Sequence, residues 1–228
     1  MSIAEKLTLA AENVPKVYEA GKNDFRDEFE KWFTANGARG TYTRAFNETD
    51  FNGYTFKTTI KPKSIGRMFY NYKGTELPKN IDCSLSACSG NEESNGATLT
   101  FSWASFITEI EDYKIPAQHT YYQTFSYCRK VKKIAVVRSN SNTIYTNTFE
   151  QCNSLENITF EGEIGRNISF QWSPLLTHDS LMSIINALVD YSGDSGGTTY
   201  TLTIGTDNIA KLSADEIAII ENKGWNYA

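Results

Sequence analysis

Apolar residues in the middle of the chain recur at intervals of three, three, three and two residues. The stretch FEQCNSLENITF, residues 149–160, follows this rule, and FSYCRKVKKIAV, residues 125–136, follows it 24 positions earlier. A spacing that changes from three to two is typical of a turn that leads into a strand. The pattern therefore predicts stacked coils with parallel strands. The residues expected to point inward from these strands are Ile134, Val136, Ile158 and Phe160.

Weaker copies of the pattern precede these two coils. Residues 69–77 fit it loosely, and residues 106–115 fit it with one position shifted. Their apolar positions are Phe69, Tyr72 and Leu77 in the first, and Phe106, Ile110, Tyr113 and Ile115 in the second. Residues 54–60 and 99–103 alternate apolar and polar positions, which predicts two strands. In the second strand the residues expected on one face are Leu99, Phe101 and Trp103.

The first 40 residues have a helical pattern. Apolar residues recur at intervals of four and three in the opening segment, although Pro15 interrupts it. These residues are Ile3, Leu7, Ala10, Val14 and Val17. A second amphipathic helix is expected over 23–35. We expect residues 1–40 to form a separate helical segment that either joins copies of the chain into a homo-oligomer or caps the first coil.

The C-terminal part predicts a helix, a strand and a second helix. Thr177 is suited to the N-cap of a helix with one apolar face, and Ser213 to the N-cap of the last helix. The apolar face consists of Leu181, Ile184, Ile185 and Leu188. Between the helices, Tyr200, Leu202 and Ile204 alternate with polar residues, which indicates a strand.

The two clear coils, residues 125–160, resemble the BspA-like leucine-rich repeats of bacterial surface and bacteriophage-associated proteins, which read roughly F-x-x-C-x-x-L-x-x-I-x-apolar. The opening IAEKLTLAAENVPKVYEAG and the run from Leu176 to Trp225 resemble the ends of leucine-rich-repeat proteins encoded in prophages of gut Firmicutes. The resemblance implies an α/β fold: a short right-handed leucine-rich-repeat-like solenoid with a parallel sheet over 41–228, closed by a helix-strand-helix cap. It also implies a tail-associated or surface protein with a role in adhesion.

Composition narrows the function further. The chain has 228 residues, of which 40% are hydrophobic and 21% charged, and no apolar run approaches the roughly 20 residues that span a bilayer. The N-terminus lacks a basic segment before a continuous apolar core, so we expect no signal peptide and no membrane insertion. We expect synthesis in the bacterial cytoplasm and incorporation into a virion. The net charge of −5 predicts no nucleic-acid partner.

Four cysteines and two histidines offer little catalytic chemistry. No C-x-x-C pair suggests zinc, and no G-x-S-x-G, Walker or dinucleotide motif occurs, so we predict neither an enzyme nor a cofactor. Stacking places Cys128 and Cys152 within reach of a disulfide, or leaves both as buried thiols. Asp190 and Asp194 suit either calcium or a turn. The 27 acidic residues leave a hydrolase with two facing carboxylates as an alternative.

The outward positions of the predicted strands are the expected binding face, because strand side chains alternate between core and solvent. These positions are Lys133, Ala135, Val137, Asn157, Thr159 and Glu161, with Tyr113 on an earlier coil. We predict a non-enzymatic binding or structural module that recognises a protein or glycan through this face. The alternatives are a cell-wall or polysaccharide hydrolase of a phage particle and an intracellular protein-interaction scaffold.

Overall fold

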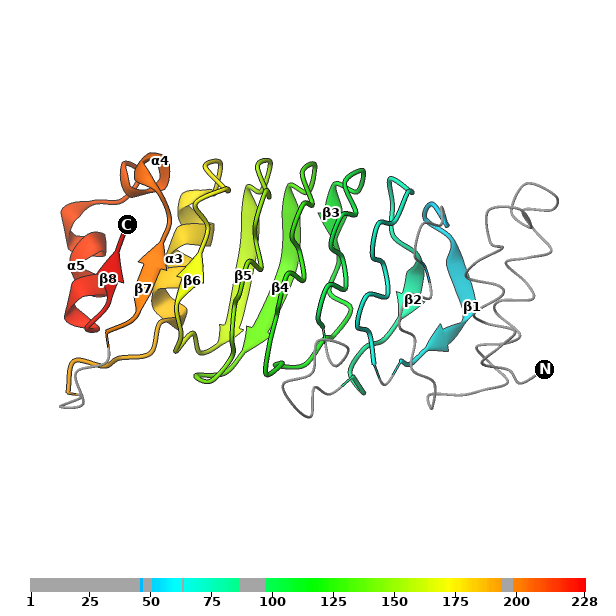
Figure 1. The fold of residues 1–228 in the computed structure, drawn as a ribbon, viewed down its shortest axis with the longest axis horizontal. Coiled ribbons are helices and arrows are strands. Elements are labelled where there is room, and N and C mark those ends of the chain that lie inside the picture. Colours follow the sequence, from blue (N-terminus) through cyan, green and yellow to red (C-terminus); the bar gives the residue numbers. More distant parts are fainter. Residues whose placement is uncertain (1–45, 47–50, 63, 87–96, 194–198) are drawn as a thin grey trace.

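The computed structural model describes residues 46, 51–62, 64–86, 97–193 and 199–228. They form a mixed α/β structure with small parallel sheets and few helices. The elements follow one another along the long axis in chain order, from β1 at one end to α5 and β8 at the other (Figure 1). The predicted helices within residues 1–40 lie outside the described residues, as do Cys88 and Asp194.

Two parallel sheets occupy the first two thirds of the described chain. Strand β1 (Thr55–Ile60) pairs with β2 (Lys79–Ile81), which confirms the strand expected over 54–60. The second sheet contains β3 (Glu109–Ile110), β4 (Lys133–Ser139) and β5 (Asn157–Gly162), all parallel. Ile110 pairs with Ile134 and Ile134 with Ile158, so equivalent residues 24 positions apart are neighbours. The predicted parallel arrangement of the two clear coils is therefore confirmed.

A ladder of phenylalanine rings runs through the core of the molecule. Six rings stack in turn, with centroids 4.5–5.6 Å apart and interplanar angles of at most 22°. In order, they belong to Phe46, Phe69, Phe101, Phe125, Phe149 and Phe170. All six side chains are buried, so one aromatic residue from each segment contributes to a single continuous interior.

The ladder corrects the alignment of the weaker repeat. Phe101, which lies 24 residues before Phe125, occupies the ladder, whereas Phe106 is 45% exposed. Counted from Phe101, residues 101–110 have the same spacing as the two clear coils, and the positions equivalent to cysteine and valine are Ala104 and Ile107. The sequence therefore contains a third copy of the three-residue spacing, which is concealed by alanine at the cysteine position and by Asp112 at the last apolar position.

Cys128 and Cys152 are fully buried free thiols. Each thiol donates a hydrogen bond to the backbone carbonyl of the preceding segment, at Phe101 and Phe125 respectively. Burial raises the pKa of the Cys152 thiol to about 12 and also raises the pKa of Cys128. Of the two alternatives for this pair, the structure has the buried thiols and no bridge.

The strand predicted over 99–103 is wrong. Leu99 and Trp103 have φ angles of +55° and +63°, and residues 97–103 form successive turns. The amides of Leu99, Phe101 and Trp103 donate to carbonyls of the next segment, and the amides between them donate three residues back. The polar residues between them, Thr100 and Ser102, are buried as well. The Thr100 hydroxyl donates a hydrogen bond to the Ile65 carbonyl. An alternating pattern therefore lies here on a turn.

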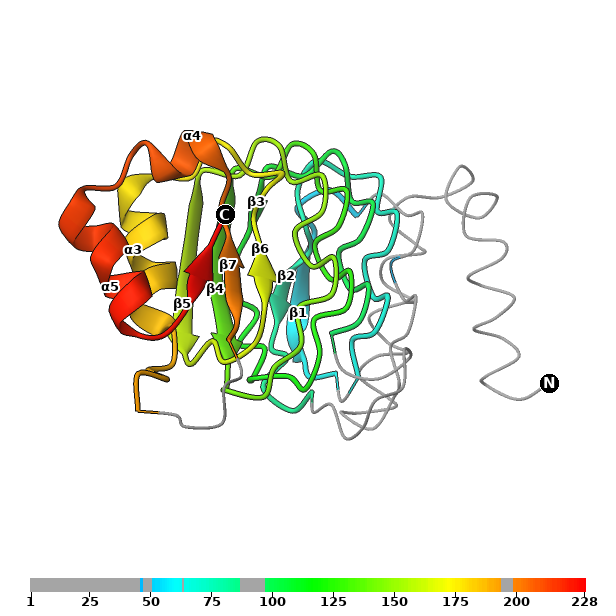
Figure 2. The same cartoon turned by 60° about the vertical axis from the view of Figure 1, so that its left-hand side comes forward.

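The C-terminal part places helices beside the β3–β4–β5 sheet and strands on the other side. Helix α3 (His178–Ala187) begins after Thr177, whose hydroxyl accepts from the Ser180 amide, as predicted. The other elements are β6 (Ile168–Ser169), β7 (Thr201–Thr203), α4 (Thr206–Ile209), α5 (Ala214–Asn222) and β8 (Asn226–Tyr227). Strands β6, β7 and β8 form a third parallel sheet, and α3 and α5 lie on the side away from β6 (Figure 2).

Helix α3 closes the open edge of the β3–β4–β5 sheet. The Ser180 hydroxyl accepts from the Ile158 amide at 3.0 Å and donates to the Glu156 carbonyl at 3.1 Å. The Ser183 hydroxyl accepts from the Phe160 amide at 2.9 Å. Two serines on one helical face thus satisfy edge groups that would otherwise be free to pair with another strand.

Lys223 and His178 connect the C-terminal elements to one another. The Lys223 ammonium donates to the carbonyls of Ile185, Asn186 and Leu188 at the end of α3. His178 contacts Glu216 across α3 and α5, with Nε2 and Oε1 2.7 Å apart. Ser213 and Glu216 form a capping box at the start of α5, which confirms the predicted start of this helix. None of the described helices is long and apolar enough to cross a membrane.

Candidate functional site

Most of the predicted binding residues lie on two adjacent strands, β4 and β5. Together with β3 these strands present what is here called the strand face, defined as the exposed side chains of β3, β4 and β5. Lys133, Asn157, Thr159 and Glu161 are exposed, and Ala135 is half-buried. Lys133 and Asn157 are register partners, so the outward side chains form rows across the strands. The structure brings five of the seven predicted residues to one surface.

Val137 and Tyr113 are corrections to the predicted face. The register shifts between Ile134 and Val137, because β4 contains one more residue than β5 in this interval. A bulge of this kind turns the following side chains to the opposite face, so Val137 is buried beside Phe160, and Val136, which was expected to point inward, is half-buried. Tyr113 is buried next to Phe101, and its hydroxyl donates to the Pro78 carbonyl at 2.7 Å. Neither side chain is accessible to a partner.

Charges on the strand face are compensated within the face. The Lys133 ammonium contacts Glu109 at 2.6 Å. The Arg138 guanidinium makes two hydrogen bonds to Asp112, at 2.7 and 2.8 Å, and one contact of 2.8 Å to Glu161. The hydrogen bonds from Arg138 hold the pKa of Asp112 below its ordinary value. Each cation is thus fixed by a carboxylate from a neighbouring strand, which leaves little net field for charge-driven recognition.

An exposed aromatic ridge, defined by Trp103, Phe106 and Tyr127, lies on the turns. The rings of Trp103 and Tyr127 stack at 4.1 Å with an interplanar angle of 5°. Cations cover the other parts of the ridge: the Arg129 guanidinium lies 5.5 Å from the Tyr127 ring and the Lys130 ammonium 5.4 Å from the Phe106 ring. Much of the aromatic surface therefore already has partners within the chain.

A cleft of about 480 Å³ opens beside β6 and β7. It is lined by residues 144–147, by residues 166–169, and by Tyr200, Thr201 and Thr203. The lining combines polar side chains with apolar surface, with Ile144 as its exposed apolar residue and Arg166 as its cation. No sequence motif marks this site, because the residues that meet there are distant in the chain. Arg166 donates hydrogen bonds to Asn142, 24 residues away, and to Tyr200, 34 residues away.

A smaller cleft of about 240 Å³ lies between β2 and β3 and contains three glutamates. Two of them are engaged: Glu109 contacts Lys133 at 2.6 Å and Glu111 contacts Lys79 at 3.8 Å. The third is Glu76, on the opposite side of the cleft lining. These carboxylates are the residues that the alternative function, a hydrolase with two facing carboxylates, would use.

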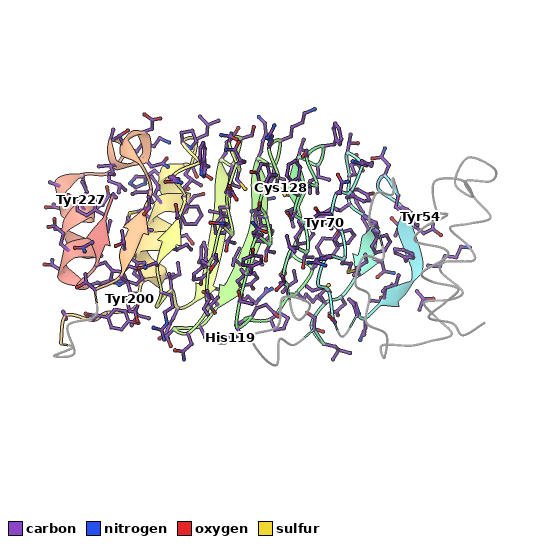
Figure 3. The ribbon with its side chains drawn as sticks, viewed as in Figure 1. Tyr54, Tyr70, His119, Cys128, Tyr200 and Tyr227 are labelled. Carbon is purple, nitrogen blue, oxygen red and sulfur yellow. The ribbon has the colours of Figure 1, made fainter. Side chains whose placement is uncertain are left out.

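The aspartates and histidines considered for metal binding or catalysis do not form a common site in the described part of the chain. Within the described ranges, no group of three side chains is arranged to hold a metal ion. Asp190 accepts from the Ser192 amide at 2.9 Å, as expected for a turn. His119 is half-buried at the lower margin of the molecule (Figure 3), and His178 is tied to Glu216. The hydrogen bonds of Ser213 and His178 lower the pKa of Glu216.

Comparison of the chain with protein-family models, with curated proteins and with solved structures gives no match. Its class is therefore given by the structure: an α/β protein with small parallel sheets and few helices.

Proposed function

We propose that the chain is a short right-handed solenoid of the leucine-rich-repeat type that acts as a non-enzymatic binding or structural module. Its support is the 24-residue register between β3, β4 and β5, together with one stacked phenylalanine from each segment. Stacked repeats of this kind present extended surfaces on which binding proteins display variable side chains. The resemblance of residues 125–160 to BspA-like repeats agrees with this function.

The observation that carries the proposal is the parallel register of the exposed strand residues. Lys133 lies directly beside Asn157, and the exposed Thr159 and Glu161 follow on the same strand. The neutral hydrogen-bonding side chains, Asn157 and Thr159, alternate with core residues along β5, a repeat that an extended peptide or an oligosaccharide can follow. Because the cations of this face are paired, we propose recognition by short-range polar contacts with a protein or glycan.

The association with a phage particle rests on the resemblance of the two chain ends to prophage-encoded proteins. In that setting, the strand face would contact the host surface, and residues 1–40 would join copies of the chain or attach to a tail component. A cell-wall hydrolase of the same particle is the alternative, because the small cleft between β2 and β3 contains carboxylates.

The test is binding of purified chain to host cell-wall polysaccharide and to a glycan array. We expect retention by the wall preparation without release of soluble sugar. Thr159→Arg, which places a bulky cation on the strand face, should reduce retention tenfold or more. The matched control is Asn153→Arg, at an exposed position on the turns. Retention that is equal in both variants would contradict the strand face, and release of sugar fragments would favour the hydrolase.

A further inference from the structure

The cleft beside β6 and β7 contains a cation that has no carboxylate partner in the described part of the chain. Arg166 donates through its two terminal nitrogens to the Tyr200 hydroxyl and, at 3.2 Å, to the Asn142 side-chain oxygen. Its guanidinium also lies 5.4 Å from the centre of the Tyr200 ring. These contacts are all neutral. They orient the guanidinium without neutralising it, in contrast to Arg138, which lies between two carboxylates.

Donor groups remain available on Arg166. A guanidinium carries five N–H groups in a planar fork, and its contacts with Tyr200 and Asn142 use two of them. The remaining donors suit the two oxygens of a carboxylate, which a guanidinium binds in bidentate geometry. The side chain is exposed and lines the cleft, so a ligand reaches it from solvent.

The rest of the lining suits a ligand rich in hydroxyl groups. The Asn167 oxygen accepts from the Thr201 amide at 2.8 Å, which leaves its NH₂ group as a donor toward a ligand. Ser169 and Thr203 supply hydroxyls, which both donate and accept. The half-buried Tyr200 ring and Ile144, which is 41% exposed, supply apolar surface for the C–H face of a sugar ring.

We propose that this cleft binds a glycan that bears a carboxylate, such as a uronic or sialic acid residue. The carboxylate pairs with Arg166, and the sugar hydroxyls pair with Asn167, Ser169 and Thr203. The cleft, at about 480 Å³, is within the range of roughly 300–1,000 Å³ typical of small-molecule sites. This site lies apart from the strand face and does not depend on the function proposed for it. Tyr200 directly precedes β7 and lies at the lower margin of the ribbon (Figure 3).

The experiment titrates the full chain calorimetrically with two matched pairs of sugars: trigalacturonate with its methyl ester, and 3′-sialyllactose with lactose. At least one acidic sugar should bind roughly tenfold or more tightly than its neutral partner, because a charge-assisted bidentate contact is lost in the neutral sugar. Equal binding within each pair, or no binding of either acid at millimolar concentration, would overturn the proposal.

Variants of the chain identify the site. Arg166→Gln should abolish the preference for the acidic sugar, and Arg166→Lys should retain part of it, because an ammonium keeps the charge but not the fork. Arg129→Gln, on the aromatic ridge, is the charge-matched control and should bind as the parent does. Thermal unfolding of each variant shows whether the fold is retained.

Two further outcomes decide against an acidic glycan in the cleft. An oligoglutamate peptide that binds more tightly than both acidic sugars and also depends on Arg166 would indicate an acidic protein as the ligand. Binding of the acidic sugars that survives Arg166→Gln but is lost in Thr159→Arg would belong to the strand face. In that case the cleft proposal fails and the function proposed for the strand face is supported.

Discussion

The middle of the chain, residues 97–162, and the C-terminal part, residues 163–193 with 199–228, share a core but differ in the backbone around it. Phe149 stacks on Phe170 at 4.5 Å, so the ring ladder crosses the boundary without a break. In the middle, β3, β4 and β5 form one side of the molecule and turns form the other. In the C-terminal part, α3 takes the place of a strand next to β5, and β6 and β7 lie beside residues 144–147.

This difference teaches that the interior constrains side-chain spacing more than backbone conformation. A strand beside β5 would leave another open edge, whereas α3 ends the sheet because its serine hydroxyls satisfy the amides of Ile158 and Phe160. The C-terminal part thus closes the stack while it continues the core. It also creates the large cleft, since β6 and β7 replace the turns of the earlier segments at this point.

The largest expected effect comes from removing a ring that both neighbouring segments contact. Phe125 is buried between Phe101 and Phe149, with centroid distances of 5.6 and 5.5 Å. Phe125→Ala should lower the free energy of unfolding by about 3–5 kcal/mol, because it removes apolar burial and leaves a cavity. Urea denaturation measures the loss. Phe106→Ala, at an exposed ring, should cost within about 0.5 kcal/mol; equal losses in the two variants would contradict a continuous ladder.

A smaller effect is expected at the junction of the two regions. Ser180→Ala should lower the free energy of unfolding by about 1–3 kcal/mol, because the buried Ile158 amide loses its partner, whereas the Glu156 carbonyl still accepts from the Thr177 amide. Amide exchange should accelerate at Ile158, and in the companion variant Ser183→Ala it should accelerate at Phe160 instead. Ser169→Ala, at an exposed hydroxyl, serves as the control. If exchange at Ile158 were the same in Ser180→Ala as in the parent, α3 would not be what closes the edge.

The smallest effect concerns the ion pairs that occur on the strand face of the middle region. The pKa of Asp112 is lower in the folded than in the unfolded chain. Asp112 therefore stabilises the fold at pH values above its unfolded pKa of about 3.9, and this contribution is lost as the pH falls through its folded pKa. Asp112→Asn should therefore cost roughly 1 kcal/mol or less at pH 7 and nothing near pH 2. Urea denaturation at several pH values measures the difference.

The double variant tests the assignment of that pH dependence. In an Arg138→Gln background, Asp112→Asn should cost less at pH 7, because the hydrogen bonds that lower the pKa of Asp112 are already absent. An undiminished cost would show that Arg138 is not the cause.

Much of the core and several helix ends were predictable from local spacing. The interval of three, three, three and two residues identified the neighbours Ile134 and Ile158, and the capping residues Thr177 and Ser213 marked the starts of α3 and α5. The repeat that begins at Phe101 was missed because Ala104 stands where cysteine was expected. Five positions of the strand face were predicted correctly as accessible, whereas Val137 was not, because a bulge has no signature in this stretch of β-branched residues.

The large cleft was beyond prediction for a different reason. Arg166 meets Asn142 and Tyr200 only after the chain has passed along the stack, and none of these residues belongs to a recognisable motif. Likewise, residues 97–103 look like a strand in isolation, but their amides bond alternately to the next segment and to residues three positions earlier. Contacts between segments therefore override the local preference for extended structure.

By itself, the sequence determined the period of the repeat, most of the core positions in the two clear coils and the starts of two helices, because each depends on side chains within a few residues of one another. Only the tertiary structure decided which polar residues are buried, where β4 bulges, how α3 satisfies the edge of β5 and which side chains meet in the cleft. These features depend on hydrogen-bond partners supplied by other segments, and a donor cannot be assigned to its acceptor until the segments lie side by side.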